Sequence, residues 1–249
     1  MEEINSANVF PSSFQLFPLG DAAIVVQFGD TISEEVHATV RAFSLLLEAQ
    51  PFPGFIELVP AFTTVTIYYN PWLISQKGRY DPYQSVVDLL LPLLTQTYQE
   101  PHELPSRLIE IPVCYGGKYG PDLEFVAIHN GLSSEMVVSL HSATEYMVYM
   151  IGFAPGFPYL GGMNSLIATP RRDSPRPAIP PGSVGIAGDQ TGIYPLQTPG
   201  GWQLIGRTPL TLFQPFRQSP SLLKAGDKVR FVPISEKEFL NRKELAHES

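Results

Sequence analysis

The fold of the second half of the chain is decided by residues 182–207, which read GSVGIAGDQTGIYPLQTPGGWQLIGR. Short runs of apolar and β-branched residues alternate here with turns rich in glycine and proline, and similar runs follow on the C-terminal side. The pattern predicts strands at residues 183–187, 193–197, 203–207, 210–213 and 228–233. Many short strands with frequent turns are typical of a closed β-barrel, which is the fold we predict for this half.

On the N-terminal side of this stretch, three further elements extend the predicted barrel domain. Residues 107–114 and 145–153 have strand-like patterns, and residues 133–141 predict a short helix that begins at Ser133 or Ser134. We therefore predict that the β-barrel domain spans residues 105–236.

The chain before residue 101 has a different pattern, in which two pairs of strand-like runs are each followed by a helix-like run. This order predicts an α+β domain at residues 10–101, with two helices on an antiparallel or mixed sheet. The predicted elements are residues 14–18, 22–28, 33–49, 55–59, 63–69 and 82–99. Pro92 should kink the last helix. Residues 101–105, which begin and end with proline, are the predicted linker.

The composition indicates an acidic globular protein. Among 249 residues, 16 Lys and Arg stand against 24 Asp and Glu, which gives a formal net charge of -8. Such a chain lacks the broad basic surface that attracts nucleic acids or anionic membranes, and its apolar runs are too short to span a bilayer. The start resembles no secretory signal, and the single cysteine, Cys114, forms no internal disulfide. We expect a cytoplasmic protein with no nucleic-acid or membrane partner.

A glycine-rich segment, residues 152–162, reads GFAPGFPYLGG and contains too many glycines and prolines for a helix or a regular strand. We expect a shaped loop. Its glycines would let the backbone approach a ligand, while Phe153, Phe157 and Tyr159 would wall a small pocket. Alternatively, the aromatic rings fill the barrel core, and the sequence leaves both interpretations open.

Two other loops carry residues that suit ligand binding. Arg171, Arg172 and Arg176 lie on a proline-rich loop and could clamp a carboxylate or a phosphate, or they could form a solvated turn paired with Asp173. The TPGGW segment, residues 198–202, is either a second ligand-facing turn or a β-turn with its tryptophan in the core.

Two single residues are candidates for chemistry. His141 closes the predicted short helix and could act as an acid, a base or a phosphate donor, or interact as a cation with the helix end. Cys114 could be a nucleophile beside a base, or a buried inert thiol. The sequence has no P-loop, no nucleophile elbow and no metal-binding pair at helical spacing. It therefore predicts no metal site and no self-sufficient catalytic apparatus.

Five sequence segments occur in an order that is typical of one family. These are VCYGGKYGPDLEFVA (113–127), SLHS (139–142), MIGFAPGFPYLGGM (150–163), PRRDSPRPAIPPGSVGIAGDQTGIYPLQTPGGWQLIGRTP (170–209) and AGDKVRF (225–231). They resemble the successive motifs of the KipI family, which includes the B subunit of the three-component bacterial 5-oxoprolinase and chains labelled allophanate hydrolase subunit 1. The resemblance covers nearly the whole chain.

The resemblance implies an α+β N-terminal domain followed by a cyclophilin-like β-barrel domain. It also implies a complex with the larger, KipA-like C subunit of 5-oxoprolinase and with its A subunit. Together the three open 5-oxoproline to L-glutamate while ATP is hydrolysed. ATP is then the implied cofactor, with Mg²⁺ carried by the nucleotide or by a partner.

The resemblance also carries over candidate site residues by motif position. Contacts with substrate or nucleotide are expected at Gly156, Phe157, Tyr159, Arg171, Gln190, Tyr194, Gly200 and Gly201. The catalytic candidates are His141 and Arg172.

Other functions remain open at the level of the sequence. KipI-type members can inhibit a sensor histidine kinase by direct binding, which would require only a surface. Hydrolysis of allophanate or urea would require an amidase Ser-Ser-Lys arrangement that the sequence lacks. A prolyl isomerase activity would rest on analogy of fold alone.

Overall fold

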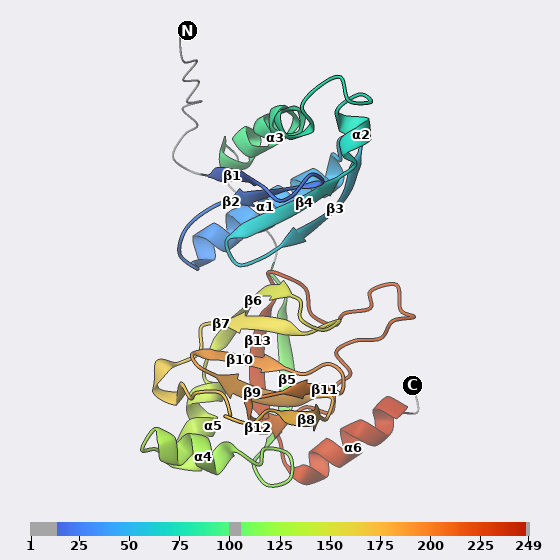
Figure 1. Ribbon diagram of the computed structural model, residues 1–249. Helices are drawn as coiled ribbons and strands as arrows, with labels where there is room; N and C mark the ends of the chain where they lie inside the picture. Colours follow the sequence, from blue (N-terminus) through green and yellow to red (C-terminus); the bar gives the residue numbers. More distant parts are fainter. Residues whose placement is uncertain (1–13, 100–105, 248–249) are drawn as a thin grey trace. The chain divides into compact units, whose positions relative to one another are not determined.

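The computed structural model describes residues 14–99 and 106–247, and the chain divides into two compact units between residues 104 and 105 (Figure 1). The predicted linker at residues 101–105 lies outside the described residues. The predicted domain bounds, 10–101 and 105–236, stay predictions for the same reason. None of the helices in the described ranges has the length and hydropathy that a membrane span requires.

The first unit is a four-stranded antiparallel sheet, in the order β1-β2-β4-β3, with helices packed on it. Its elements are β1 (Gln15–Pro18), β2 (Ala23–Gln27), α1 (Glu34–Ala49), β3 (Phe55–Pro60), β4 (Thr64–Tyr69), α2 (Pro71–Ile74) and α3 (Pro82–Gln99). Alternate residues of β4, such as Val65 and Ile67, are buried because successive strand side chains point to opposite faces. They share one core with Phe43 of α1 and Leu90 of α3, so both helices cover the same face of the sheet.

The second unit contains a closed barrel in the order β10-β7-β6-β13-β5-β12-β9, which confirms the predicted barrel. Its strands are β5 (Leu108–Tyr115), β6 (Glu145–Ile151), β7 (Pro158–Gly161), β9 (Ser183–Ala187), β10 (Gln190–Ile193), β12 (Gln203–Arg207) and β13 (Lys228–Pro233). β13 pairs with β5 in parallel, while its pairing with β6 is antiparallel. Two shorter strands, β8 (Arg176–Ile179) and β11 (Thr198–Gly200), pair with each other beside the barrel.

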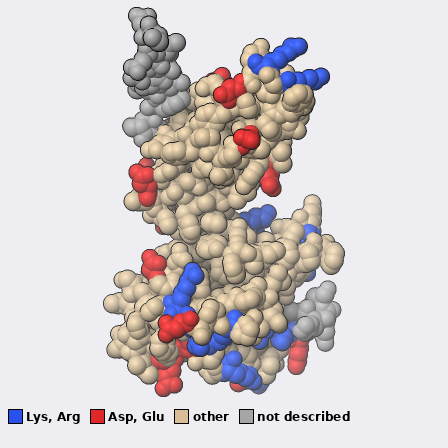
Figure 2. Space-filling model, viewed as in Figure 1, with Lys and Arg blue, Asp and Glu red and all other residues tan. Residues whose placement is uncertain are grey.

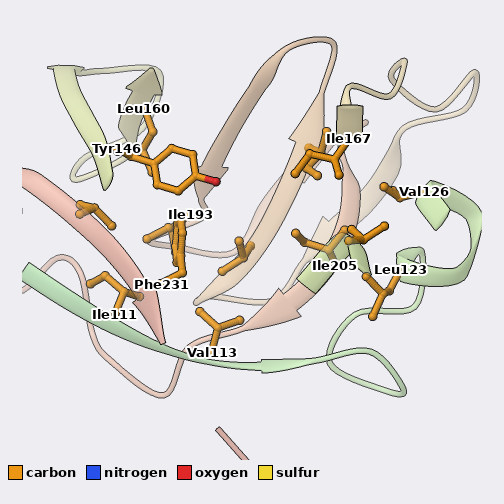
Figure 3. Packing of buried hydrophobic residues seen from close by; sticks show 14 of the residues in the cluster. Ile111, Val113, Leu123, Val126, Tyr146, Leu160, Ile167, Ile193, Ile205 and Phe231 are labelled. Carbon is orange, nitrogen blue, oxygen red and sulfur yellow. The ribbon is translucent and has the colours of Figure 1, made fainter. Parts of the chain in front are cut away.

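Apolar side chains from strands far apart in the sequence fill the barrel. Ile111 and Val113 of β5, Ile205 of β12 and Phe231 of β13 meet in one buried cluster (Figure 3). Tyr146 of β6 adds its ring, whose centroid lies 5.2 Å from that of Phe231. The helices of this unit are α4 (Leu123–His129), α5 (Ser134–Ser142), the 3-10 turn η1 (Ser165–Ile167) and α6 (Glu236–His247).

Two predicted strands are wrong, one in its position and the other because no strand forms there. The run at 193–197 is replaced by β10, which begins at Gln190 because Gly188, with φ of 60°, and Asp189 form a tight turn after β9. Pro195 has no N–H group to donate to a sheet. Residues 210–213 form no strand and contribute only a single bridge between Phe213 and Ser221.

Other differences concern the ends of elements and elements that the pattern did not predict. The strand predicted at 145–153 ends at Ile151, before Phe153 adopts a φ of 64°. The glycine-rich segment is a loop only in its first part, because residues 158–161 form β7. The elements that were not predicted are α2, α4, η1, β8, β11 and α6, and β11 replaces the first part of the turn predicted at residues 198–202. α6 is largely exposed and polar, and its buried contact comes from Phe239 against Tyr119.

The start of α5 settles one alternative that the sequence left open. Ser133 is the N-cap, and its hydroxyl accepts a hydrogen bond from Met136 N at 3.2 Å. Ser134 is the first helical residue and has no such role.

We expect Ser133→Ala to lower the free energy of unfolding by about 1 kcal/mol, because it leaves a helix N–H group without its acceptor. Ser134→Ala is the matched control and should change stability by less than about 0.5 kcal/mol. Urea unfolding followed by circular dichroism measures both variants. Equal losses in the two variants would contradict the assignment of Ser133 as the cap.

Candidate functional site

A cavity of about 310 Å³ opens on the barrel unit. It is lined by Phe153, Phe157, Tyr159, Arg171, Pro175, Tyr194, Pro199, Gly200, Gly201 and Trp202. These residues come from the glycine-rich segment, the arginine loop and the TPGGW segment, together with Tyr194, which directly follows β10. Three segments that were separate candidates in the sequence therefore meet at one cavity.

Phe157 is the centre of the aromatic wall. Its ring is 2% exposed and lies edge-on to three other rings, with centroid distances of 5.2 Å to Tyr159, 5.5 Å to Tyr194 and 5.7 Å to Trp202. Edge-to-face pairs of this kind stabilise one arrangement of the rings. Phe153 adds a fourth ring at 5.4 Å and is 67% exposed at the rim. The aromatic rings therefore both wall the cavity and form a small core of their own, so the two interpretations of this segment are compatible.

Glycines allow the aromatic side chains to approach the backbone. A Cβ atom at Gly200 would lie 2.5 Å from the Tyr194 hydroxyl and 2.6 Å from Ile179 Cδ1. At the neighbouring Gly201, the nearest atom would be 3.7 Å away. The backbone at Gly200 is thus packed against Tyr194, while a Cβ atom at Gly201 would make only ordinary van der Waals contacts.

The three arginines have separate roles. Arg171 lines the cavity, whereas Arg172 and Arg176 pair with Asp122 at 3.2 and 2.7 Å. Asp122 is buried and also accepts a hydrogen bond from Leu204 N at 2.6 Å. The sequence suggested a turn in which the arginines pair with Asp173. Arg172 and Arg176 pair instead with Asp122, which precedes α4.

The Tyr194 hydroxyl is a neutral polar group beside the cavity. Burial raises the pKa of Tyr194 to about 12, although a hydrogen bond from the Trp202 backbone and the charges of Arg171 and Arg176 act in the opposite direction. The phenol is therefore protonated at neutral pH. Because its oxygen already accepts the bond from Trp202, its own proton is available to a ligand.

His141 is fully buried inside the barrel and does not line the cavity. Its Nδ1 lies 2.8 Å from the Tyr115 hydroxyl, and its Nε2 lies 2.8 Å from Thr191 Oγ1. Burial lowers the pKa of His141 to about 3, so the ring is neutral at neutral pH. A neutral ring does not act as a cation at the helix end. Its acid–base role stays a prediction.

Comparison with known proteins covers nearly the whole chain. A family model described as carboxyltransferase domain, subdomain C and D, matches residues 14–223. The chain belongs to this family. The B subunit of 5-oxoprolinase from Bacillus subtilis (strain 168) is 53% identical to this carboxyltransferase-domain chain over 234 residues, which are 93% of this chain and 97% of the relative. The B subunit of 5-oxoprolinase from Escherichia coli O157:H7 is 44% identical, over 88% of this chain and 95% of the relative. These relatives confirm the family that the motifs predicted.

A solved structure extends the comparison. The crystal structure of TTHA0988 superposes with a TM-score of 0.73 and 37% sequence identity. The match covers 86% of this carboxyltransferase-domain chain but only 40% of the solved chain. This chain therefore corresponds to less than half the length of that relative.

Within this carboxyltransferase-domain chain, the cavity brings together six of the candidate site residues. These are Phe157, Tyr159, Arg171, Tyr194, Gly200 and Gly201. The other four do not line the cavity. Gly156 packs against Phe213, Gln190 pairs with Ala187 at the start of β10, Arg172 bonds to Asp122 and His141 lies in the barrel core.

Sequence reasoning did not include three lining residues among its candidates, namely Pro175, Pro199 and Trp202. Trp202 lies in the TPGGW segment, and its interpretation as a core residue is also correct because it is 7% exposed. The sequence also gave no indication that Asp122 is structurally important, because its partners Arg172 and Arg176 are about fifty positions away from it in the chain.

We expect the two neighbouring glycines of the cavity wall to respond differently to alanine. Gly200→Ala should lower the free energy of unfolding by about 1–3 kcal/mol, because the new methyl group overlaps Tyr194 and Ile179. Gly201→Ala should stay within about 0.5 kcal/mol of the unsubstituted chain. Urea unfolding measures both, and similar losses would contradict the packing described for Gly200.

We expect the free energy of unfolding to decrease as the pH falls from 6.5 toward 3, because unfolded His141 binds a proton in this range and the folded ring does not. At pH 5 this group should account for a loss of about 2 kcal/mol, since one pKa unit corresponds to about 1.36 kcal/mol. Urea unfolding at pH 7 and pH 5 should show this extra loss in the unsubstituted chain and not in His141→Gln. The same pH dependence in both proteins would show that His141 titrates normally.

Proposed function

We propose that this chain is the B subunit of an ATP-dependent 5-oxoprolinase complex, which opens 5-oxoproline to L-glutamate with hydrolysis of ATP. The observation that carries the proposal is the 53% identity to the B subunit of a 5-oxoprolinase, over 93% of this chain and 97% of the relative. A match of this extent includes both units of the fold and all three segments that form the cavity.

The chain is proposed to act as part of a heteromeric assembly. Its relatives are named as subunits, and it matches only 40% of the solved TTHA0988 chain. The proposed partners are the KipA-like C subunit of 5-oxoprolinase and its A subunit. The cavity contains one cation, Arg171, and four aromatic rings beside Phe157, but no nucleophile paired with a base among the described residues that line it. Completion of the active site by a partner is consistent with this residue set.

The cavity suits the chemistry of 5-oxoproline, a small flat lactam with one carboxylate. Its volume of about 310 Å³ is near the lower end of ligand pockets, which suits a small molecule. Arg171 has no carboxylate partner among the described residues and can pair with the substrate carboxylate. The aromatic wall around Phe157 packs against the ring, and the Tyr194 hydroxyl can donate to the lactam oxygen.

The same cavity does not suit an entire Mg²⁺–ATP complex. Arg171 is the only cation among the described residues that line it, and a triphosphate carries several negative charges. Within residues 14–99 and 106–247, no three His, Cys, Asp or Glu side chains gather in a way that could hold a metal ion. We therefore assign the nucleotide and its Mg²⁺ to a part of the assembly outside this cavity.

The proposed reaction activates a stable amide. The lactam oxygen attacks the terminal phosphorus of ATP and ADP leaves, which makes the ring carbon a better electrophile. Water then attacks that carbon, and the C–N bond breaks as the nitrogen takes up a proton, which leaves an acyl phosphate. A second water hydrolyses the acyl phosphate to the carboxylate of glutamate and inorganic phosphate. In this scheme Arg171 and Tyr194 bind and orient the lactam against the aromatic wall.

The test is release of glutamate from 5-oxoproline and ATP by the purified A and C subunits, with and without this chain. Activity should require the chain. Arg171→Gln should raise KM at least about tenfold, because the carboxylate loses a charge-assisted bond. Arg217→Gln removes the same charge from an exposed loop outside the cavity and should leave KM unchanged.

Two results would overturn the proposal in different ways. A stable complex that makes no glutamate would show that the substrate is wrong. Full activity without the chain would show that the complex does not require it. Inhibition of a sensor histidine kinase, the alternative function, is not favoured by the names of the relatives and would require tight binding to a kinase that blocks its phosphorylation.

A further inference from the structure

A second cavity of about 300 Å³ lies on the barrel unit and shares no lining residue with the first. Arg207 at the end of β12 and Lys243 of α6 line it, together with Thr208, Thr211 and Phe239. Among the described residues that line it, none is an Asp or a Glu. In a chain with a net charge of -8, a cavity with two cations and no acid is unusual.

Four of the eight arginines in the barrel unit pair with carboxylates. Arg107 pairs with Asp227, Arg176 with Asp122 and Arg230 with Glu145. Figure 2 shows Lys and Arg side chains on the barrel with Asp and Glu side chains interspersed among them. The ion pairs of the described residues leave out Arg171, Arg207, Arg217 and Arg242, and of these four only Arg207 is partly buried.

The contacts of Arg207 orient its guanidinium and leave part of it available. Its Nε donates to Pro181 O at 2.8 Å, and no described residue accepts from the two outer nitrogens. Burial lowers the pKa of Arg207, and no carboxylate opposes this effect. An arginine stays protonated in proteins, so a half-buried guanidinium without an acid gains stability from a bound anion.

The position of Lys243 is fixed by Phe239, a buried residue of the same helix that also lines the cavity. Phe239 is 2% exposed, and its ring lies 4.5 Å from that of Tyr119, which fixes α6 on the barrel. Lys243 follows Phe239 by four positions and therefore lies on the same face of the helix. The ammonium group is thus tethered near the opening, and the Thr211 hydroxyl supplies a further donor.

We propose that this second cavity, lined by Arg207 and Lys243, binds the phosphate group of a small molecule. A phosphate monoester carries a charge of about -1.5 to -2 near pH 7, which matches two cations better than a single carboxylate does. The planar fork of arginine also matches the geometry of phosphate oxygens. The volume exceeds that of a phosphate group, so there is room for part of an attached organic group. The inference goes beyond the proposed function and does not depend on it.

The test is isothermal titration of the full chain with inorganic phosphate and, separately, with ADP, at constant ionic strength. We expect saturable binding of both, and Arg207→Gln should weaken it at least about tenfold. Lys243→Gln should weaken it less, because lysine contributes a single point charge. Tighter binding of ADP would show that the nucleoside occupies the rest of the cavity, whereas equal affinities would show that only the phosphate is held.

Two control variants distinguish binding at this cavity from general attraction of anions to positive charges on the surface. Arg217→Gln removes a guanidinium from an exposed loop, and Lys237→Gln removes an ammonium from α6 outside the cavity. Both should bind like the unsubstituted chain. The proposal is overturned if phosphate and ADP show no saturable binding, if these controls weaken binding as much as the cavity variants do, or if 5-oxoproline displaces phosphate. Lys243 is exposed, so its variant tests the site even if Arg207→Gln fails to fold.

Discussion

The carboxylate of Asp122 is the interaction on which the geometry of the first cavity depends. It is 5% exposed, and it accepts bonds from Arg172, Arg176 and the backbone N–H of Leu204. Leu204 O in turn accepts from Asp122 N at 2.9 Å. The start of α4, the arginine loop and β12 are thus joined at one buried charge. A buried carboxylate is costly unless it is fully paired, so this arrangement disfavours alternative positions of the loop.

The position of Arg171 follows from these contacts. The backbone N–H of Arg172 donates to Gly201 O at 2.7 Å, which joins the arginine loop directly to the TPGGW segment. With Arg172 and Arg176 turned toward Asp122, Arg171 is left at the cavity. The loop therefore uses two of its three guanidiniums for its own structure and presents one to a ligand. This division explains how a loop with three arginines contributes only one cation to the cavity.

The sequence predicted the barrel because its signals are local. Short β-branched runs such as that of β9, and turn residues between them, act within a few positions. The glycine-rich segment and the TPGGW segment were recognised for the same reason, and both line the cavity. What could not be predicted depends on contacts between distant residues. Asp122 is separated from Arg172 by 50 positions, and no local pattern indicates that pairing. The burial of His141 of α5, which makes its ring neutral, likewise depends on Tyr115 of β5 and Thr191 of β10.

The two cavities differ in the residues that surround their arginines, and therefore in the ligands that they favour. Arg171 is exposed beside aromatic rings that pack edge-to-face, so its cavity favours a ligand that is mostly apolar with one negative charge. Arg207 lies beside Lys243 and hydroxyl groups, so it favours a compact ligand with two negative charges. In both places the described residues leave the guanidinium without an acid, although carboxylates pair with other arginines of the same unit. Arg207 is partly buried, so its lack of an acid reduces stability and is explained best by an anion that binds there. Arg171 is exposed, so the lack of an acid leaves its guanidinium open to a ligand without this cost.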